Sequence, residues 1–377
     1  MDTYAMNLPP HWLVAANDTG TTDAEISPEA LAPSQKFARQ KVSIICVTSL
    51  AKHLLQAEAA RVQRGEICLG SWQVMSNRLD AHILPLLGPL PAAELRTVHA
   101  QDLIDHLGAK GLSTTTIAQY LVLLRKVAMQ GVLRGVLQEM PQFPKVKIRS
   151  QPRGSFSVRE YRALVAAARS LREQPHPQLE TLAPGNRFWI ARELLYMPAE
   201  LPWLIRWMVN TFVRPSDIKF VQHKHVEVVR GRSLYLRLRL PETKRHSQPM
   251  VSLRPAVHVY EQLLAHRREQ GMAGPDDYLF MPQIANRDHA LALLGFFFQW
   301  ALRQTHLEKG PQGQTRTLYC LRHTAITLRL LYGQGIDMLT LARNARTSVN
   351  MIERFYASTL SGEMNVEMLQ SRRGKRT

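Results

Sequence analysis

Residues 319–324 read YCLRHT, and an amphipathic segment at residues 352–356 reads IERFY. The first stretch places Arg322 on a predicted helix, and the second ends in Tyr356. A guanidinium is planar and can hold two phosphate oxygens at once, while a phenol oxygen can attack phosphorus. The pair therefore indicates chemistry on a phosphodiester.

Two further cations lie upstream of this pair. Arg214 stands in VRPSD at residues 213–217, and Lys244 stands in ETKR at residues 242–245, between two predicted strands. A second arginine can share the charge on the non-bridging oxygens, and a lysine can protonate a departing oxygen. Taken alone, Arg214 could equally cap a helix or pair with Asp217.

The chain is strongly basic, with a formal net charge of +18 at pH 7 over 377 residues. Residues 1–35 contain five acids and no Lys or Arg, so the remainder carries +23. This excess favours a polyanionic partner, above all double-stranded DNA. A solvated basic surface is the alternative interpretation.

Cysteines and apolar runs exclude several classes of protein. Cys46, Cys68 and Cys320 are odd in number and far apart, which predicts neither a disulfide framework nor a metal site. The N-terminus does not resemble a signal peptide, and the longest apolar run, residues 290–302, is too short to span a bilayer. We expect a cytoplasmic, nucleoid-associated protein with no membrane segment and no cofactor.

The N-terminal part divides into an acidic tail and a helical domain. Residues 1–35 are polar and are predicted to be a disordered acidic tail. Residues 36–139 have helical periodicity and should form a small domain of four helices. The clearest helix follows Ser113, a good N-cap, and repeats Ile117 and Leu124 at helical spacing.

Residues 140–154 are rich in proline and in basic residues, which is typical of an extended linker. If two domains grip one duplex, such a linker passes close to phosphates; a plain solvated loop is the alternative. Further basic residues stand on a predicted strand and beside Lys244. The candidate DNA-binding residues are Lys145, Lys147, Arg149, Arg153, Arg237, Arg239 and Arg245.

A second domain is predicted over residues 155–362, followed by a C-terminal helix and basic tail at 363–377. Its first helix begins with a capping box, Ser157 to Glu160. At residues 234–240 leucines alternate with Tyr, Arg and Arg, which predicts a strand with one buried and one basic face. The fold class is thus mainly α with a small β-hairpin or sheet.

The second domain resembles the catalytic domain of the tyrosine recombinases, the phage-integrase family. Its arginine before a short helix, its hairpin lysine, its Leu-Arg-His-Thr box and its late tyrosine occur in the family's order. The helical domain is similar in size and position to the family's core-binding (SAM-like) domain, including GLSTTTI at residues 111–117. The resemblance covers nearly everything after residue 45.

The resemblance implies a role for each of four residues. Tyr356 would attack the scissile phosphate, forming a 3′-phosphotyrosyl link and freeing a 5′-hydroxyl, while Arg214 and Arg322 would hold the non-bridging oxygens. Lys244 would protonate the departing 5′-oxygen. Because the covalent link conserves the bond energy, rejoining would need neither ATP nor a metal. Tyr356 as a core aromatic is the alternative.

Two positions depart from the family's pattern. A histidine is common where this chain has Tyr319, and His or Trp is common where it has Thr347. Both hydroxyls can donate a hydrogen bond to a phosphate oxygen, but neither is a good base near neutral pH. We therefore expect Tyr319 and Thr347 to belong to the catalytic set and leave the general base for Tyr356 open.

The resemblance implies a site-specific recombinase or integrase of a mobile element. Its expected partners are double-stranded DNA and three further copies of the chain, forming a homotetramer on two DNA sites. An accessory DNA-bending protein is left open. The alternatives are a Xer-like dimer resolvase, a type IB topoisomerase and a catalytically decayed, sequence-specific DNA-binding regulator.

Overall fold

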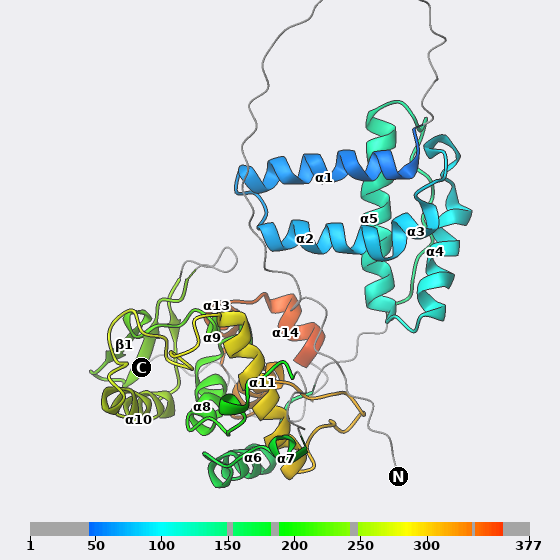
Figure 1. Cartoon of the computed structure of the whole chain (residues 1–377). Helices are drawn as coiled ribbons and strands as arrows, with labels where there is room; N and C mark the ends of the chain where they lie inside the picture. Colours follow the sequence, from blue (N-terminus) through cyan, green and yellow to red (C-terminus); the bar gives the residue numbers. More distant parts are fainter. Residues whose placement is uncertain (1–44, 149–153, 182–187, 242–247, 334–335, 357–377) are drawn as a thin grey trace, which may run out of the picture. The chain divides into compact units, whose positions relative to one another are not determined.

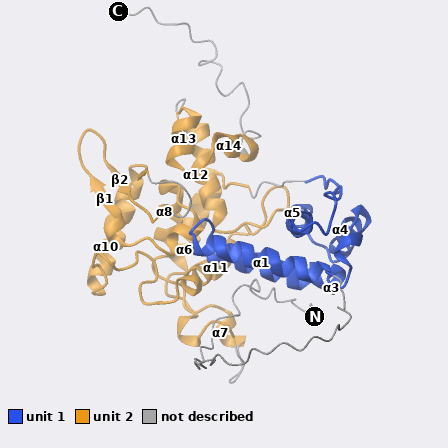
Figure 2. Ribbon diagram, turned by 90° about the horizontal axis from the view of Figure 1, so that it is seen from above, with its two compact units in different colours: residues 1–148 blue, residues 149–377 orange. Residues whose placement is uncertain are grey.

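The computed structural model describes residues 45–148, 154–181, 188–241, 248–333 and 336–356. The chain divides into two compact units, residues 1–148 and 149–377 (Figure 2). The predicted acidic tail and the predicted C-terminal helix and basic tail lie outside the described residues.

Unit 1 is helical (Figure 1). Its elements are α1 (Val47–Gln63), α2 (Leu69–Arg78), a π-helical turn η2 (Leu79–Ile83), α3 (Leu84–Leu87), a 3₁₀ turn η3 (Ala92–Glu94), α4 (Thr97–Ala109) and α5 (Thr114–Leu133).

Helix α5 organises unit 1. Its N-cap is Ser113, whose Oγ accepts a hydrogen bond from the Thr116 N–H at 3.2 Å. Its apolar face is buried against α1 and α4, and α1 also packs on α2. Met140, Phe143 and Val146, in the first part of the predicted linker, pack against this same core.

Unit 2 combines helices with a small sheet. Its elements are α6 (Val158–Ser170), α7 (Gln178–Thr181), η4 (Arg192–Leu194), α8 (Leu201–Thr211), α9 (Pro215–Ile218), η5 (His223–His225), β1 (Val226–Val229), β2 (Tyr235–Leu238), β3 (Met250–Val251), α10 (Pro255–Glu269), α11 (Arg287–Gln304), α12 (Tyr319–Tyr332), α13 (Met338–Asn344) and α14 (Val349–Tyr356). The predicted fold class, mainly α with a small antiparallel sheet, is confirmed.

Helix α8 forms the centre of unit 2. It packs against α6, α10, α11 and α12, and nine of its eleven residues are buried. A helix covered on all sides must be apolar all round, which explains the long apolar stretch in the sequence. Pro202 lies in its first turn, where proline is tolerated because that N–H has no partner within the helix. The helix ends at Phe212, which has left-handed backbone (φ 60°).

The three strands form one antiparallel sheet in the order β1-β2-β3. Leu236 and Leu238 face the core, as the alternation predicts. The register places Glu227 of β1 opposite Arg237 of β2. The Glu227 carboxylate accepts hydrogen bonds from Arg237 at 2.7 Å and from Arg239 at 2.9 Å, so the basic face of β2 is partly neutralised by its neighbour.

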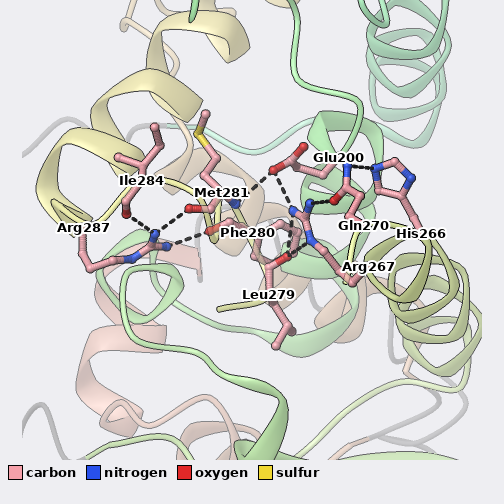
Figure 3. A network of polar contacts seen from close by, with 9 residues as sticks. All are labelled: Glu200, His266, Arg267, Gln270, Leu279, Phe280, Met281, Ile284 and Arg287. Atoms are coloured by element: carbon pink, nitrogen blue, oxygen red, sulfur yellow. Dashed lines mark hydrogen bonds and ion pairs between the residues drawn. The ribbon is translucent and has the colours of Figure 1, made fainter. Parts of the chain in front are cut away.

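Two arginines hold the loop between α10 and α11 (Figure 3). Arg267 is 2% exposed, forms an ion pair with Glu200 at 2.8 Å and donates to the Leu279 carbonyl. Arg287 donates to the carbonyls of Phe280 and Met281, both at 2.7 Å. The carbonyl groups of these three buried residues are thus satisfied by guanidinium donors, as buried backbone requires. These two arginines stabilise the loop.

Within the described residues, no helix is long and apolar enough to cross a membrane. Nor do the described side chains of His, Cys, Asp and Glu gather into a group of three or more that could hold a metal ion.

Candidate active site

Arg214 stands at the N-terminus of the short helix α9. Its backbone N–H donates to the Asp217 carboxylate at 2.8 Å, and Pro215 occupies the first helical position. Asp217 is therefore a helix cap that fixes the Arg214 backbone. Arg214 is half-buried, and its Nη2 donates to the backbone carbonyl of Arg346.

Arg322 lies deeper, at the fourth position of α12, and is 2% exposed. Its Nη1 donates to the Phe212 carbonyl and its Nη2 to the Ala345 carbonyl. These acceptors lie at the C-terminal ends of α8 and α13, where unpaired carbonyls carry a partial negative charge. One guanidinium therefore joins three helices of unit 2.

Both arginines donate hydrogen bonds to the turn that follows α13. Arg346 has left-handed backbone (φ 51°), its N–H donates to the Arg343 carbonyl, and the Thr347 N–H donates to the Ala342 carbonyl at 2.9 Å. This double closure is a Schellman motif, in which glycine is the usual left-handed residue. The motif turns the Ala345 and Arg346 carbonyls toward Arg322 and Arg214 respectively.

The Tyr319 ring lies beside the ring of His323. The two rings have centroids 5.1 Å apart, and the His323 ring is in turn 6.5 Å from that of Phe355 on α14. His323 thus packs between the first residue of α12 and the end of α14. Tyr319 and Thr347 are both half-buried.

Tyr356 is the last residue of α14, and its side chain lies outside the described residues. The helix is anchored by Ile352, which is fully buried, and it packs against α13. Because Phe355 reaches His323, the helix end lies against the start of α12, the helix that carries Arg322.

The remaining candidates fall into three groups. Lys145 and Lys147 are exposed at the end of unit 1, and Arg237 and Arg239 share Glu227. The Arg237 hydrogen bond, reinforced by Arg239, lowers the pKa of Glu227, which is therefore ionised at neutral pH. The others lie outside the described residues: Lys244, Arg245, Arg149 and Arg153.

Sequence reasoning missed two residues at this site, Asn344 and Arg346. Arg346 is 2% exposed, and its Nη2 donates to the Pro241 carbonyl at 3.4 Å. Asn344 bonds the backbone of Val251 in β3. Neither has a local sequence signal, because an arginine in a left-handed turn and an asparagine at a helix end acquire their roles only from distant segments.

Comparisons with known proteins agree with this architecture. No protein-family model and no curated protein matches the chain. Among solved structures, the Tn1549 transposon integrase in complex with a circular intermediate DNA is similar over 86% of this chain and 98% of that one, with a TM-score of 0.59 and 13% identity.

Lambda integrase gives a similar result. Its 75–356 fragment, solved as a dimer bound to a COC′ core site, aligns over 88% of this chain and 98% of that one, with a TM-score of 0.59 and 14% identity. A lambda integrase tetramer bound to a Holliday junction aligns over 83% and 78%, with a TM-score of 0.59 and 13% identity. The chain has the tyrosine recombinase fold, as the sequence motifs predict.

Proposed function

We propose that this protein is a site-specific DNA recombinase, the integrase of a mobile element, that cuts and rejoins DNA through a 3′-phosphotyrosyl intermediate. The observation that carries the proposal is the convergence of Arg214 and Arg322 on consecutive carbonyls, Ala345 and Arg346. That turn directly precedes α14, the helix that ends in Tyr356. Arg214, Arg322 and Tyr356, which are predicted from separate motifs, are therefore linked through the turn between α13 and α14.

The proposed reaction exchanges one phosphoester for another. The Tyr356 phenol oxygen bonds to phosphorus as the bond from phosphorus to the 5′-oxygen breaks, and the phenol proton leaves to a base. Lys244 gives a proton to the departing 5′-oxygen, so the products are a 3′-phosphotyrosine and a 5′-hydroxyl. Attack by a different 5′-hydroxyl reverses these steps and joins new partners.

Carbonyl oxygens and phosphate oxygens compete for the same donors in this proposal. A guanidinium has five N–H donors, and its positive charge is attracted more strongly to an anionic phosphate oxygen than to a neutral carbonyl oxygen. Arg214 is half-buried, so an entering phosphate would meet its guanidinium before that of the buried Arg322. Arg322 would then stabilise the phosphate from its buried position, through its positive charge beside the turn.

The proposed partners are inferred from the net charge of the chain and from the assemblies in which the similar solved structures occur. The excess of basic residues predicts binding to double-stranded DNA whose affinity falls with salt, with a log–log slope of about −0.9 per phosphate neutralised. Lambda integrase is known as a tetramer on a Holliday junction. We propose the same stoichiometry here, four copies on two sites, with the exposed Lys145 and Lys147 contacting phosphates. An accessory bending protein is not required by any described feature.

The test is strand exchange between two duplexes of different length that carry DNA from the flanks of the protein's own gene. A recombinase converts them into two products of new length, and Tyr356→Phe yields none. Relaxation of supercoiled DNA without exchange would assign the chain to the topoisomerases. Tight, salt-sensitive binding with neither activity would assign it to the DNA-binding regulators.

A further inference from the structure

Helices α6 and α10 both pack against α8, and a hollow of about 580 Å³ opens beside all three. Small-molecule sites commonly measure about 300–1,000 Å³. The hollow lies toward the start of α8, whereas Arg214 follows its end, and the helix rises about 12 Å from Trp203 to Thr211. The polar and aromatic side chains that line the hollow are Arg169, Arg172, Trp203, Gln262, His266 and Glu269.

The amide of Gln262 is held in one orientation in this hollow. Trp203 Nε1 and Arg206 Nη1 both donate to Gln262 Oε1, each at 3.2 Å. Within the described part of the chain the Gln262 Nε2 group makes no hydrogen bond, so its N–H donors remain for a ligand. The ring of His266 lies 5.2 Å from that of Trp203, and Figure 3 shows the same histidine beside Gln270.

Three arginines gather here without a carboxylate partner. Arg172 lies over the Trp203 ring, with its Cζ 4.6 Å from the ring centroid, and its buried Nε makes no hydrogen bond to any described residue. Among the described residues, Arg169, Arg172 and Arg206 form no ion pair. A buried N–H without an acceptor costs free energy, which an anion in the hollow would recover.

The charges of the hollow suit a dianion. Burial lowers the pKa of Arg206, and the positive charge of Arg169 lowers it further, so these like charges repel each other. Glu269 is the one carboxylate among the lining residues, and three guanidinium groups with one carboxylate leave a charge of +2. A phosphate monoester carries close to two negative charges above neutral pH, because its second pKa is about 6.

We propose that this hollow is a second anion site, which binds the phosphate monoester group of a small ligand such as free phosphate or a nucleoside monophosphate. Arg169, Arg172 and the Gln262 amide donate hydrogen bonds to the phosphate oxygens, a task that suits planar guanidinium donors. A bound phosphate joins groups from α6 and α10 and offsets the repulsion between the arginines. The site is separate from Arg214 and Arg322 and does not depend on the proposed function.

Isothermal titration calorimetry of the full chain at pH 8 and low chloride concentration tests the proposal with three probes. These are inorganic phosphate, adenosine 5′-monophosphate and adenosine 3′,5′-cyclic monophosphate, a diester with a single charge. The first two should bind, and the cyclic diester should bind at least about tenfold more weakly than the monoester, because it lacks one charge and one acceptor oxygen. Tighter binding of the nucleotide than of phosphate would identify a nucleotide as the ligand, and equal binding would identify free phosphate.

Charge-reversal variants locate the binding. Arg169→Glu changes an exposed side chain, so the fold should be kept, and it should weaken phosphate binding at least about tenfold. Arg268→Glu, at an exposed position of α10 that does not line the hollow, is the matched control for net charge and should keep the wild-type affinity within about twofold. Arg214→Ala should also keep it, because that arginine belongs to the candidate active site.

Three results would overturn the inference. A wild-type protein that binds neither phosphate nor the nucleotide has no such site. Equal weakening by Arg169→Glu and Arg268→Glu would mean that phosphate responds to the net charge of the protein and not to the hollow. A cyclic diester that binds as tightly as the monoester would mean that the hollow accepts singly charged diesters, such as those of a DNA backbone.

Discussion

Arg214, the N-cap of α9, and Arg322 of α12 donate hydrogen bonds to the carbonyl oxygens of two consecutive residues, Arg346 and Ala345 respectively. The turn that supplies these carbonyls closes α13 and leads into α14, which ends in Tyr356. The arginines thus have a structural role that is present without DNA. Changes to them should alter stability as well as chemistry.

Arg322→Ala should lower the free energy of unfolding by about 2–4 kcal/mol. The change removes the donor from two carbonyls, those of Phe212 and Ala345, in a buried place, and an unsatisfied buried acceptor costs about 1–3 kcal/mol. Arg214→Ala should cost less, about 1 kcal/mol. Arg214 is half-buried, so in the variant water can reach the Arg346 carbonyl that loses its donor.

Urea unfolding of the full chain, followed by circular dichroism, measures both values. Arg322→Lys is the matched control, since it keeps the charge but cannot reach two carbonyls in a fixed fork. An Arg322→Ala protein as stable as Arg214→Ala would contradict the anchoring role.

Arg346→Gly and Arg346→Ala should differ by about 1 kcal/mol, with the glycine variant the more stable. Both lose the guanidinium contact to Pro241, but only alanine keeps a Cβ at a left-handed position (φ 51°). Thermal unfolding of the two variants side by side isolates this backbone cost. Equal melting temperatures would mean that the turn has changed its conformation.

Local patterns made much of the fold predictable. The capping box from Ser157 to Glu160 forms as expected, with the Ser157 N–H 2.7 Å from the Glu160 carboxylate. The alternation in β2 buries Leu236 and Leu238. These features depend on neighbours a few residues away, which a sequence pattern records directly.

Features set by distant contacts were not predictable. Phe212 and Arg346 are left-handed although neither is glycine, because the surrounding packing and the Arg322 hydrogen bonds outweigh a cost of about 1–2 kcal/mol. The neutralising position of Glu227 follows from the strand register, which places it opposite Arg237. Arg237 and Arg239 could therefore be recognised as basic, but not as paired.

His176 should make the protein less stable as the pH falls from about 6.5 to about 4. It is 6% exposed and packs on Phe296 and Trp300, with ring centroids at 4.5 and 4.8 Å. Burial, with a smaller contribution from the nearby Arg303 charge, lowers its pKa to about 4, whereas the unfolded chain titrates near 6.5. The unfolded state binds the proton first, so stability is fully present above pH 6.5 and is lost toward pH 4, by about 3 kcal/mol.

Urea unfolding at pH 7 and pH 4.5 measures this loss. His176→Asn keeps an acceptor for the Gln178 N–H, which donates to His176 Nδ1 at 3.1 Å, and removes the titrating group. The variant should lose less stability between the two pH values than the wild type. Identical losses would show that other groups cause the pH dependence.

The covalent link to Tyr356 is the central claim, and peptide mapping of the trapped adduct tests it most directly. Sheared DNA from the source genome, nicked to prevent rejoining, is incubated with the protein, quenched in SDS and digested with nuclease and trypsin. Trypsin cuts after Arg354 and Arg372, so residues 355–372 form a peptide whose one tyrosine is Tyr356. We predict that mass spectrometry finds the phosphonucleotide on this peptide and that Tyr356→Phe yields none. A nucleotide on the peptide of residues 317–322, which contains Tyr319, or an unmodified protein throughout, would contradict the account.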